Sequence, residues 1–527
     1  MVVEFLESDL SQMQKDAEKQ NARNDHINSE KIPKFFLVGK EWEYRGEGNG
    51  SIVLSLPKDK IIIRITKVGD NEQMSFRDSI EVKNMIPNPA YPIGTLKETM
   101  ERLVFSENVI GKLLEGSLVK KGTIYHMEPS EIQKLSAILD PIRPGNRLHK
   151  RLNPRGLVTG YPDCTLLQGA SSISLYPTYC VEIKPKQGFK STPNHKRCPF
   201  CLNQFLKAKN GKIARRSSYC PLDLFSGSYQ RMFRAAKELI RTPQNNLRIF
   251  KNGNLALSEE NSVEAIPVLN EWLGKKDKVD NGHPHSADDM HSRSFSNFAH
   301  LLIQALLSPL PKKSQPTSRA EHYCDRPMNG FASSLQFPDI CNGSLEQTRT
   351  SSIFDPCDTR MDILPEGSLL DSLLKTQKLG EVPACSLYKA YDKLAEDTEK
   401  DVDLLDRLRW SSGAYEDIDW LLNDENEDDF EAALKIIQKY RILATTRDCS
   451  IMIIFDRVHS SDGIEDLVIQ DLEDRLYRCQ ISVVDLDPKP ITCVLKHRRR
   501  ERSMTEAYSQ AVENGEENPQ NSPCVFY

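Results

Sequence analysis

Residues 180–189 read Cys-Val-Glu-Ile-Lys-Pro-Lys-Gln-Gly-Phe, and the fold can be worked out from this stretch outward. Residues 174–183 are largely apolar and β-branched, which predicts a strand. Lys184 and Lys186 follow two positions apart, so a period of two places both ammonium groups on one face, and Pro185 stiffens the exit. Two neighbouring lysines repel each other unless an anion lies between them. The pattern therefore indicates either an anion site or a solvated strand end.

A glycine-rich segment, residues 46–51 (Gly-Glu-Gly-Asn-Gly-Ser), lies between two strand-like stretches, and residues 60–65 predict the next strand. Glycines let backbone N–H groups approach phosphate oxygens, although a plain hairpin turn has the same composition. Arg64 in the next strand is a candidate for the same phosphates. With a helix predicted over residues 97–114, this part reads as a small β-rich lobe with one packed helix.

Two acidic residues stand beside apolar strands near the other end of the chain. Asp448 directly precedes the strand predicted over residues 449–455, and Asp485 ends the one that precedes Leu486. Carboxylates in such places are natural general bases and magnesium ligands, or they simply cap strands. Further candidates for phosphate contact, each equally typical of a surface group, are Arg147, Lys207, Asn245 and Arg248.

Composition limits the class of protein. The chain has 527 residues, of which 39% are hydrophobic, and a formal net charge of −5, so it lacks a global basic field for nucleic acid. No apolar run is long enough to cross a membrane, and the first residues lack a signal-peptide core. Thirteen cysteines in such a chain favour reduced thiols and a cytoplasmic or nuclear protein.

One group of residues has the composition of a zinc site. Cys198 and Cys201 have C-x-x-C spacing, and His195 and Cys220 are two further candidate ligands. The alternative is that these cysteines are packed, reduced thiols. The basic run over residues 496–502 indicates either a nuclear-import patch or a solvated tail.

Composition and pattern divide the chain into six parts, in an α/β (α+β) class. They are a polar leader at 1–38, an N-lobe with the glycine-rich loop at 39–140, a first C-lobe part at 141–274, a flexible low-complexity insertion at 275–360, a second C-lobe part with both acids at 361–495, and a polar tail at 496–527.

Several segments together resemble the inositol-pentakisphosphate 2-kinase family. The stretches that carry the resemblance are 44–49, 180–186 with Gly188-Phe189, 219–227, 243–253, 444–453 and 485–490. The E-x-K-P-K element at residues 182–186 is that family's signature, and the segments occur in the family's order.

The resemblance implies a two-lobed, divergent kinase-like fold with ATP between the lobes. The implied reaction uses ATP and Mg²⁺ to phosphorylate the 2-hydroxyl of inositol 1,3,4,5,6-pentakisphosphate, giving inositol hexakisphosphate (phytate). The alternative is a catalytically impaired scaffold that binds inositol polyphosphates. We expect a monomer without nucleic-acid or membrane partners.

The resemblance also implies roles for individual residues. Asp448 would take the proton of the 2-hydroxyl, Lys184 would stabilise the transferred phosphoryl group and Asp485 would hold magnesium. ATP contacts are implied for Gly48, Asn49, Gly50, Ser51, Arg64, Asp163, Cys164, Glu182 and Arg248. Inositol-phosphate contacts are implied for Arg147, Lys186, Lys207, Asn245 and Lys489.

Two features depart from the family's pattern. After Pro490 the family usually carries an Arg and a Tyr that touch the substrate, whereas residues 491–500 read Ile-Thr-Cys-Val-Leu-Lys-His-Arg-Arg-Arg. Asn203 stands where many relatives have His. The family's two substrate contacts therefore cannot be placed in this stretch.

Overall fold

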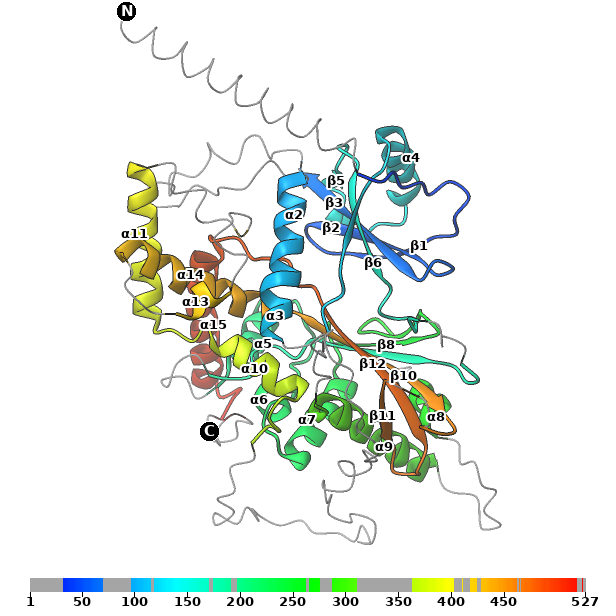
Figure 1. Cartoon of the computed structure of the whole chain (residues 1–527). Coiled ribbons are helices and arrows are strands. Elements are labelled where there is room, and N and C mark those ends of the chain that lie inside the picture. Colours follow the sequence, from blue (N-terminus) through cyan, green and yellow to red (C-terminus); the bar gives the residue numbers. More distant parts are fainter. Residues whose placement is uncertain are drawn as a thin grey trace, which may run out of the picture.

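A computed structural model of the chain shows two antiparallel sheets, the N-terminal one above the C-terminal one in Figure 1. It describes residues 32–69, 96–114, 118–169, 174–190, 197–261, 265–274, 287–309, 363–401, 410, 418–423, 428–461, 464, 466–518 and 524. Mixed helices and antiparallel sheets make this an α+β protein. None of the helices among these residues is long and apolar enough to span a membrane.

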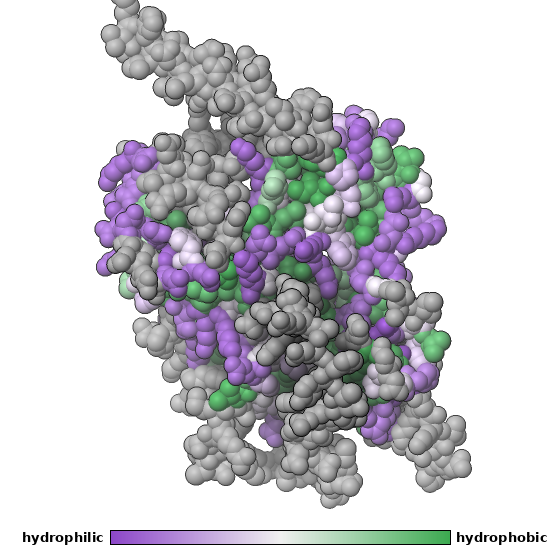
Figure 2. All heavy atoms as spheres, viewed as in Figure 1, coloured by the Kyte–Doolittle hydropathy of each residue, from purple (hydrophilic) through white to green (hydrophobic). Residues whose placement is uncertain are grey.

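The N-terminal sheet is built from β1 (Glu43–Glu47), β2 (Ser51–Leu56), β3 (Ile61–Gly69), β4 (Thr123–His126), β5 (Lys150–Leu152) and β6 (Leu157–Pro162). The order is β1-β2-β3-β6-β4, and β5 pairs with β3. One face packs on α4 (Pro129–Leu139) through Ile52, Leu54, Ile63, Ile132 and Leu135. Figure 2 shows hydrophobic surface gathered over this upper part of the molecule, where Phe36 and Ile138 are exposed.

The predicted helix over residues 97–114 links the two sheets. It consists of α2 (Leu96–Val104), a π-helical turn (Phe105–Ile110) and α3 (Gly111–Leu113). Its second half is buried in the core of the C-terminal sheet through Phe105, Val109 and Ile110. The sequence assigned this helix to the N-terminal lobe, which is wrong for its buried half, because an amphipathic face does not identify the surface it covers.

The C-terminal sheet has the order β11-β12-β10-β7-β8-β9. Its strands are β7 (Tyr179–Ile183), β8 (Leu247–Lys251), β9 (Asn254–Leu257), β10 (Ser450–Val458), β11 (Leu467–Gln470) and β12 (Leu476–Val484). Every residue of the inner strand β7 is buried, which explains its near-continuous apolar sequence. The strand begins at Tyr179 and not at residue 174, after Pro177, which cannot donate to a ladder.

Helices cover this sheet and form a separate layer beside it (Figure 1). Their bounds are α5 Pro199–Lys209, α6 Pro221–Leu224, α7 Tyr229–Arg241, α8 Ala265–Leu273, α9 Ala287–Leu307, α10 Leu369–Lys378, α11 Ala384–Lys400, α13 Asp419–Leu422, α14 Asp429–Thr446 and α15 Cys493–Glu513. A 3₁₀ turn spans Gly145–Arg147. Helices α11, α14 and α15 share a small apolar core that includes Tyr391, Ile437 and Val494.

The structure corrects three predicted segments. Helix α9, inside the expected insertion at 275–360, is buried against the C-terminal core through Phe298 and Leu302, while residues 275–286 and 310–362 lie outside the described residues. Phe35 and Leu37, assigned to the leader, are buried in the N-terminal core, and residues 1–31 lie outside the described part. The first part of the expected polar tail at 496–527 is not a tail but lies in α15. Spaced apolar residues give this polar stretch a buried face.

Candidate active site

Three strand ends meet at one edge of the C-terminal sheet. In the antiparallel ladder, Ser450 at the start of β10 lies opposite Val484 at the end of β12, and Ile451 lies opposite Ile183 at the end of β7. Residues that precede β10 and residues that follow β7 and β12 therefore leave the sheet together. This register brings Asp448, Asp485 and the E-x-K-P-K segment to one place.

Lys184 and Asp485 form the first ion pair of this edge, with 2.8 Å between Lys184 Nζ and Asp485 Oδ2. Ser450 Oγ lies 3.2 Å from the same carboxylate and donates to Glu182 at 2.8 Å. Burial alone would raise the pKa of Asp485, but the charges of Lys184 and Arg64 outweigh it and lower that pKa to about 2. Asp485 therefore stays ionised, as a cation ligand must.

Lys186 and Lys489 flank Asp448. Their Nζ atoms lie 3.0 Å and 3.7 Å from its carboxylate oxygens. Burial by itself raises the pKa of Asp448, but the two ammonium groups outweigh burial and hold that pKa below its ordinary value. Burial lowers the pKa of Lys186, and the neighbouring charge of Lys184 adds to this effect. The two lysines of the motif thus pair with different acids.

The backbone at this edge is strained at two of the site residues. Lys186 and Asp485 both have positive φ, 65° and 63°, a region that non-glycine residues rarely adopt. Tyr219 donates a 2.8 Å hydrogen bond to the carbonyl of Pro185, and Gln377 donates one of 2.9 Å to the carbonyl of Lys186. Buried hydrogen bonds therefore hold the strained loop in place, as is common at functional sites.

The glycine-rich turn faces this edge from the N-terminal sheet. A side chain on Gly48 or Gly50 would meet no atom within 4 Å, so the space beside these glycines is open to a ligand. Arg64 donates to Ser51 Oγ at 3.2 Å and to Asp487 Oδ1 at 3.2 Å. This contact connects the turn to the segment that carries Asp485, while the predicted contacts of Ser51 and Arg64 with ATP stay predictions. Asp487 was not singled out in the sequence, since nothing local links it to Arg64.

A buried cluster of ion pairs packs against the glycine-rich turn. The Glu47 carboxylate contacts Lys67 and Arg143, with 2.9 Å to Arg143 Nε, and all three side chains are at most 1% exposed. Lys67 also donates to the carbonyl of Gly48 at 2.6 Å. The conformation of the turn therefore depends on these charges.

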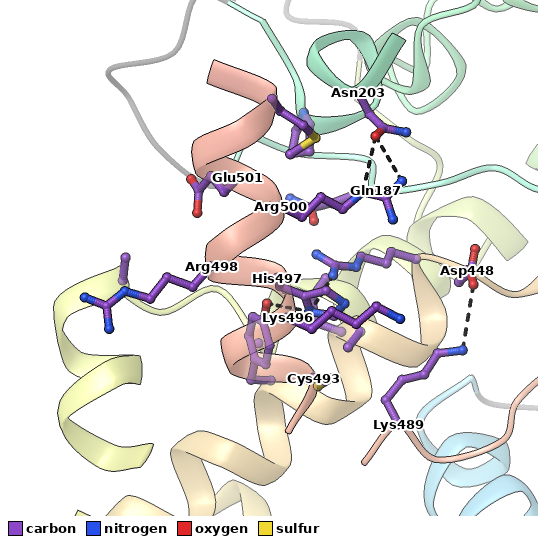
Figure 3. Close-up of a pocket in the computed structure, with 18 of the residues that line it drawn as sticks. Gln187, Asn203, Asp448, Lys489, Cys493, Lys496, His497, Arg498, Arg500 and Glu501 are labelled. Atoms are coloured by element: carbon purple, nitrogen blue, oxygen red, sulfur yellow. Dashed lines mark hydrogen bonds and ion pairs between the residues drawn. The ribbon is translucent and has the colours of Figure 1, made fainter. Parts of the chain in front are cut away.

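A cavity of about 830 Å³ opens next to the strand ends (Figure 3). Its lining includes five of the predicted residues: Lys186, Lys207, Asn245, Asp448 and Lys489. Lys207 comes from α5 and Asn245 from the loop before β8. Several separate segments thus contribute cations to one cavity, as a small polyanion requires. The volume falls in the range of typical ligand pockets.

Other predicted contacts lie elsewhere. Arg147 is not among the residues that line this cavity, and its charge acts on Tyr44 and Lys67 in the N-terminal part. Glu182 and Arg248 form a 3.5 Å ion pair from neighbouring strands. Cys164 follows β6 and is half-buried.

Asp163, predicted to contact ATP, is 1% exposed and is used by the protein itself. Its carboxylate accepts hydrogen bonds from Arg45 at 3.0 Å, Ser55 at 2.7 Å and Thr165 at 2.6 Å. The side chain therefore holds the turn after β6, and the contact of this residue with ATP stays a prediction. Sequence alone gave no sign of these partners.

Four cysteines gather at the N-terminal end of α5. The Sγ atoms of Cys198, Cys201, Cys220 and Cys524 all lie within 4.8 Å of one another, and all four residues are buried. Zinc–sulfur bonds of about 2.3 Å place thiolates of a tetrahedral site about 3.8 Å apart, so the set fits a zinc ion. The sequence predicted three of the four. It missed Cys524 because more than 300 residues separate it from the others, and His195 lies outside the described residues.

Carboxylates at the end of a buried sheet, surrounded by converging lysines and faced by an open glycine turn, define an α+β phosphotransferase-type site. The family described as inositol-pentakisphosphate 2-kinase matches residues 44–503. This chain belongs to that family.

Individual relatives carry the same name. An inositol-pentakisphosphate 2-kinase of Danio rerio is 29% identical over 469 residues, covering 85% of this chain and 89% of that protein. One from Arabidopsis thaliana is 30% identical over 44% of this chain and 56% of that protein. One from Oryza sativa subsp. indica is 23% identical over 90% of this chain and 95% of that protein.

Proposed function

We propose that the protein transfers the γ-phosphoryl group of ATP to the 2-hydroxyl of inositol 1,3,4,5,6-pentakisphosphate, giving inositol hexakisphosphate and ADP. The observation that carries this proposal is the cavity in which Lys186 and Lys489 flank Asp448 and Lys207 lines the same wall. Five phosphates at about −1.5 to −2 each give the substrate a large negative charge. Several cations from separate segments can compensate a charge of that size without a basic protein overall.

The two sheets would correspond to the two lobes of a divergent kinase-like fold, with the nucleotide between them. The turn at Gly48, Asn49 and Gly50 would meet the phosphates, beside Ser51 and Arg64, because the space next to both glycines is open. On the opposite side the nucleotide would meet Glu182, Lys184 and Arg248, with Cys164 near the adenine. This arrangement is supported by the contact between Arg64 and Asp487, which joins the turn to the strand end.

In the proposed reaction Asp448 accepts the proton of the 2-hydroxyl as the oxygen attacks the γ-phosphorus. The bond from that phosphorus to the bridging oxygen of ADP breaks, and ADP leaves. Lys184 stabilises negative charge on the transferred group, and Lys186 and Lys489 hold neighbouring phosphates. Positioning and charge compensation supply most of the catalysis in such reactions.

Two metal ions fit the residues present. Asp485 is ionised and half-exposed, so it would hold Mg²⁺, which neutralises charge on the β- and γ-phosphates when bound. Cys198, Cys201, Cys220 and Cys524 would hold a structural Zn²⁺, because four thiolates close a tetrahedral site and leave no position for substrate.

The decisive experiment is a kinase assay of the purified chain with ATP, Mg²⁺ and inositol pentakisphosphate, with Asp448→Ala and Lys184→Ala as comparison variants. We expect turnover by the wild type and a large loss of kcat in both variants. Binding of the pentakisphosphate without turnover would instead identify a scaffold. Wild-type rates in both variants would contradict the assigned roles.

A further inference from the structure

The basic run after Pro490 is part of the cavity wall. Helix α15 begins at Cys493, and Lys496, Arg499 and Arg500 in its first two turns line the same cavity as Asp448. Residues four apart lie on one face of a helix, so Lys496 and Arg500 are neighbours. Arg498 also lines the cavity, but Figure 3 shows it on the other side of the helix, where its guanidinium lies 4.2 Å from the ring centre of Tyr388.

Among the residues that the structure describes, no acid forms an ion pair with either of the two neighbouring cations. Arg500 donates two hydrogen bonds, of 2.9 and 3.2 Å, to the amide oxygen of Asn203, which carries no charge. Lys496 is exposed, and its ammonium group has no hydrogen bond or ion pair within the described residues. The contact with Asn203 on α5 directs the Arg500 side chain toward the cavity, while the positive charge of both groups stays available.

The whole wall is electropositive. Ten Lys and Arg residues line the cavity, against three Asp and Glu residues. His497 shows the effect, since burial and then the charges of Arg447, Lys496, Arg500 and Lys489 lower its pKa to about 2. Arg447 donates a 2.8 Å hydrogen bond to Nδ1 of this neutral imidazole. An excess of like charge around a concave site is relieved when an anion binds there.

We infer that Lys496 and Arg500 on α15 form a phosphate subsite of the inositol-polyphosphate cavity, distinct from the lysines that flank Asp448. This inference deepens the proposed function and rests on it. The two residues hold a phosphate that is not transferred, Arg500 through its planar guanidinium and Lys496 as a point charge. They set affinity and the preference for highly phosphorylated inositols and take no part in the chemical step.

The test uses the full chain and measures inositol hexakisphosphate binding by calorimetry. Lys496→Ala and Arg500→Ala should each weaken binding by about tenfold or more, because each removes a charge-assisted contact. Arg502→Ala is the matched control, since Arg502 is exposed on the same helix and does not line the cavity, and its affinity should equal that of the wild type. Lys496→Arg should retain most of the affinity. Wild-type affinity in both alanine variants overturns the inference.

Kinetic measurements with inositol phosphates that lack one phosphate show whether Lys496 and Arg500 contact a particular phosphate or only add to the positive potential of the cavity. The alanine variants should raise KM and leave kcat at saturating substrate unchanged. Among inositol tetrakisphosphates that each lack one phosphate, the KM penalty should shrink for the isomer that lacks the contacted phosphate. An equal penalty for every isomer overturns the subsite. Normal binding by a wild type without turnover overturns only the proposed reaction, and a wild type that does not bind inositol hexakisphosphate overturns both.

Discussion

Lys186 Nζ lies 3.0 Å from Asp448 Oδ1, so the proposed general base is paired with a proposed substrate ligand. This pairing keeps the carboxylate ionised, and it also makes the carboxylate a weaker base because its pKa is held low. A substrate phosphate that binds Lys186 withdraws part of this stabilisation. We therefore expect Asp448 to become a stronger base only when the cavity is filled.

Asp448→Asn should separate chemistry from binding. The amide keeps the shape of the side chain but cannot accept the proton, so kcat should fall roughly 10²–10⁴-fold. Removing a negative charge beside Lys186 and Lys489 should leave affinity for inositol hexakisphosphate equal or increased. Single-turnover kinetics test the loss of rate, and calorimetry tests the affinity. A loss of affinity equal to the loss of rate would contradict the assignment of Asp448 as the general base.

The pH dependence of kcat/KM, which reports ionisation in the free enzyme, should respond to Lys186. Because the pKa of Asp448 lies below its ordinary value, its ionised form persists as pH falls, and activity is lost only as pH passes through that lowered pKa. In Lys186→Met, burial is no longer opposed by this ammonium group, so the acid limb should move to higher pH. Because the wild type and the variant are measured with the same substrate, ionisation of the substrate affects both pH profiles equally. Superimposable acid limbs would contradict the pairing.

The site edge could largely be predicted from sequence, and the reason is physical. Strand ends carry local signals, so Glu182, Lys184, Asp448 and Asp485 could be placed at strand ends, and antiparallel pairing brings those ends together. The prediction that both lysines share one anion was less accurate, because the strand stops at Ile183 and the strained backbone at Lys186 separates them.

The remaining features depend on contacts that no local pattern reports. Arg64 meets Asp487 across 423 residues and Cys524 joins Cys220 across 304, so sequence spacing gives no indication of either contact. The basic run on α15 has the composition of a tail, and packing of this helix, through Val494 on α11 and α14 and through Ala507 and Ala511 on Phe205 of α5, orients it toward the cavity.

Stability should depend strongly on Glu47 and weakly on exposed acids. Glu47→Ala leaves Lys67 and Arg143 buried without their carboxylate, which should destabilise the fold by about 3–5 kcal/mol. Glu41→Ala is the control, because the Glu41–Lys58 pair is solvent-exposed and should change stability little. Urea unfolding of both variants tests the difference. Equal stabilities would show that the cluster under the glycine turn has no net effect.

Zinc binding should connect the end of the chain to the substrate cavity. Helix α5 carries Cys198 and Cys201 at its N-terminal end and Lys207, which lines the cavity, near its C-terminal end. We expect about one zinc per chain by elemental analysis, since the four thiolates close one tetrahedral site. Cys524→Ser should lose most of the metal and lower the melting temperature, and it should raise KM because α5 loses an anchor. Cys385→Ser, at an exposed cysteine outside the cluster, should behave as the wild type. A Cys524→Ser chain that keeps its zinc and its KM would exclude this residue as the fourth ligand.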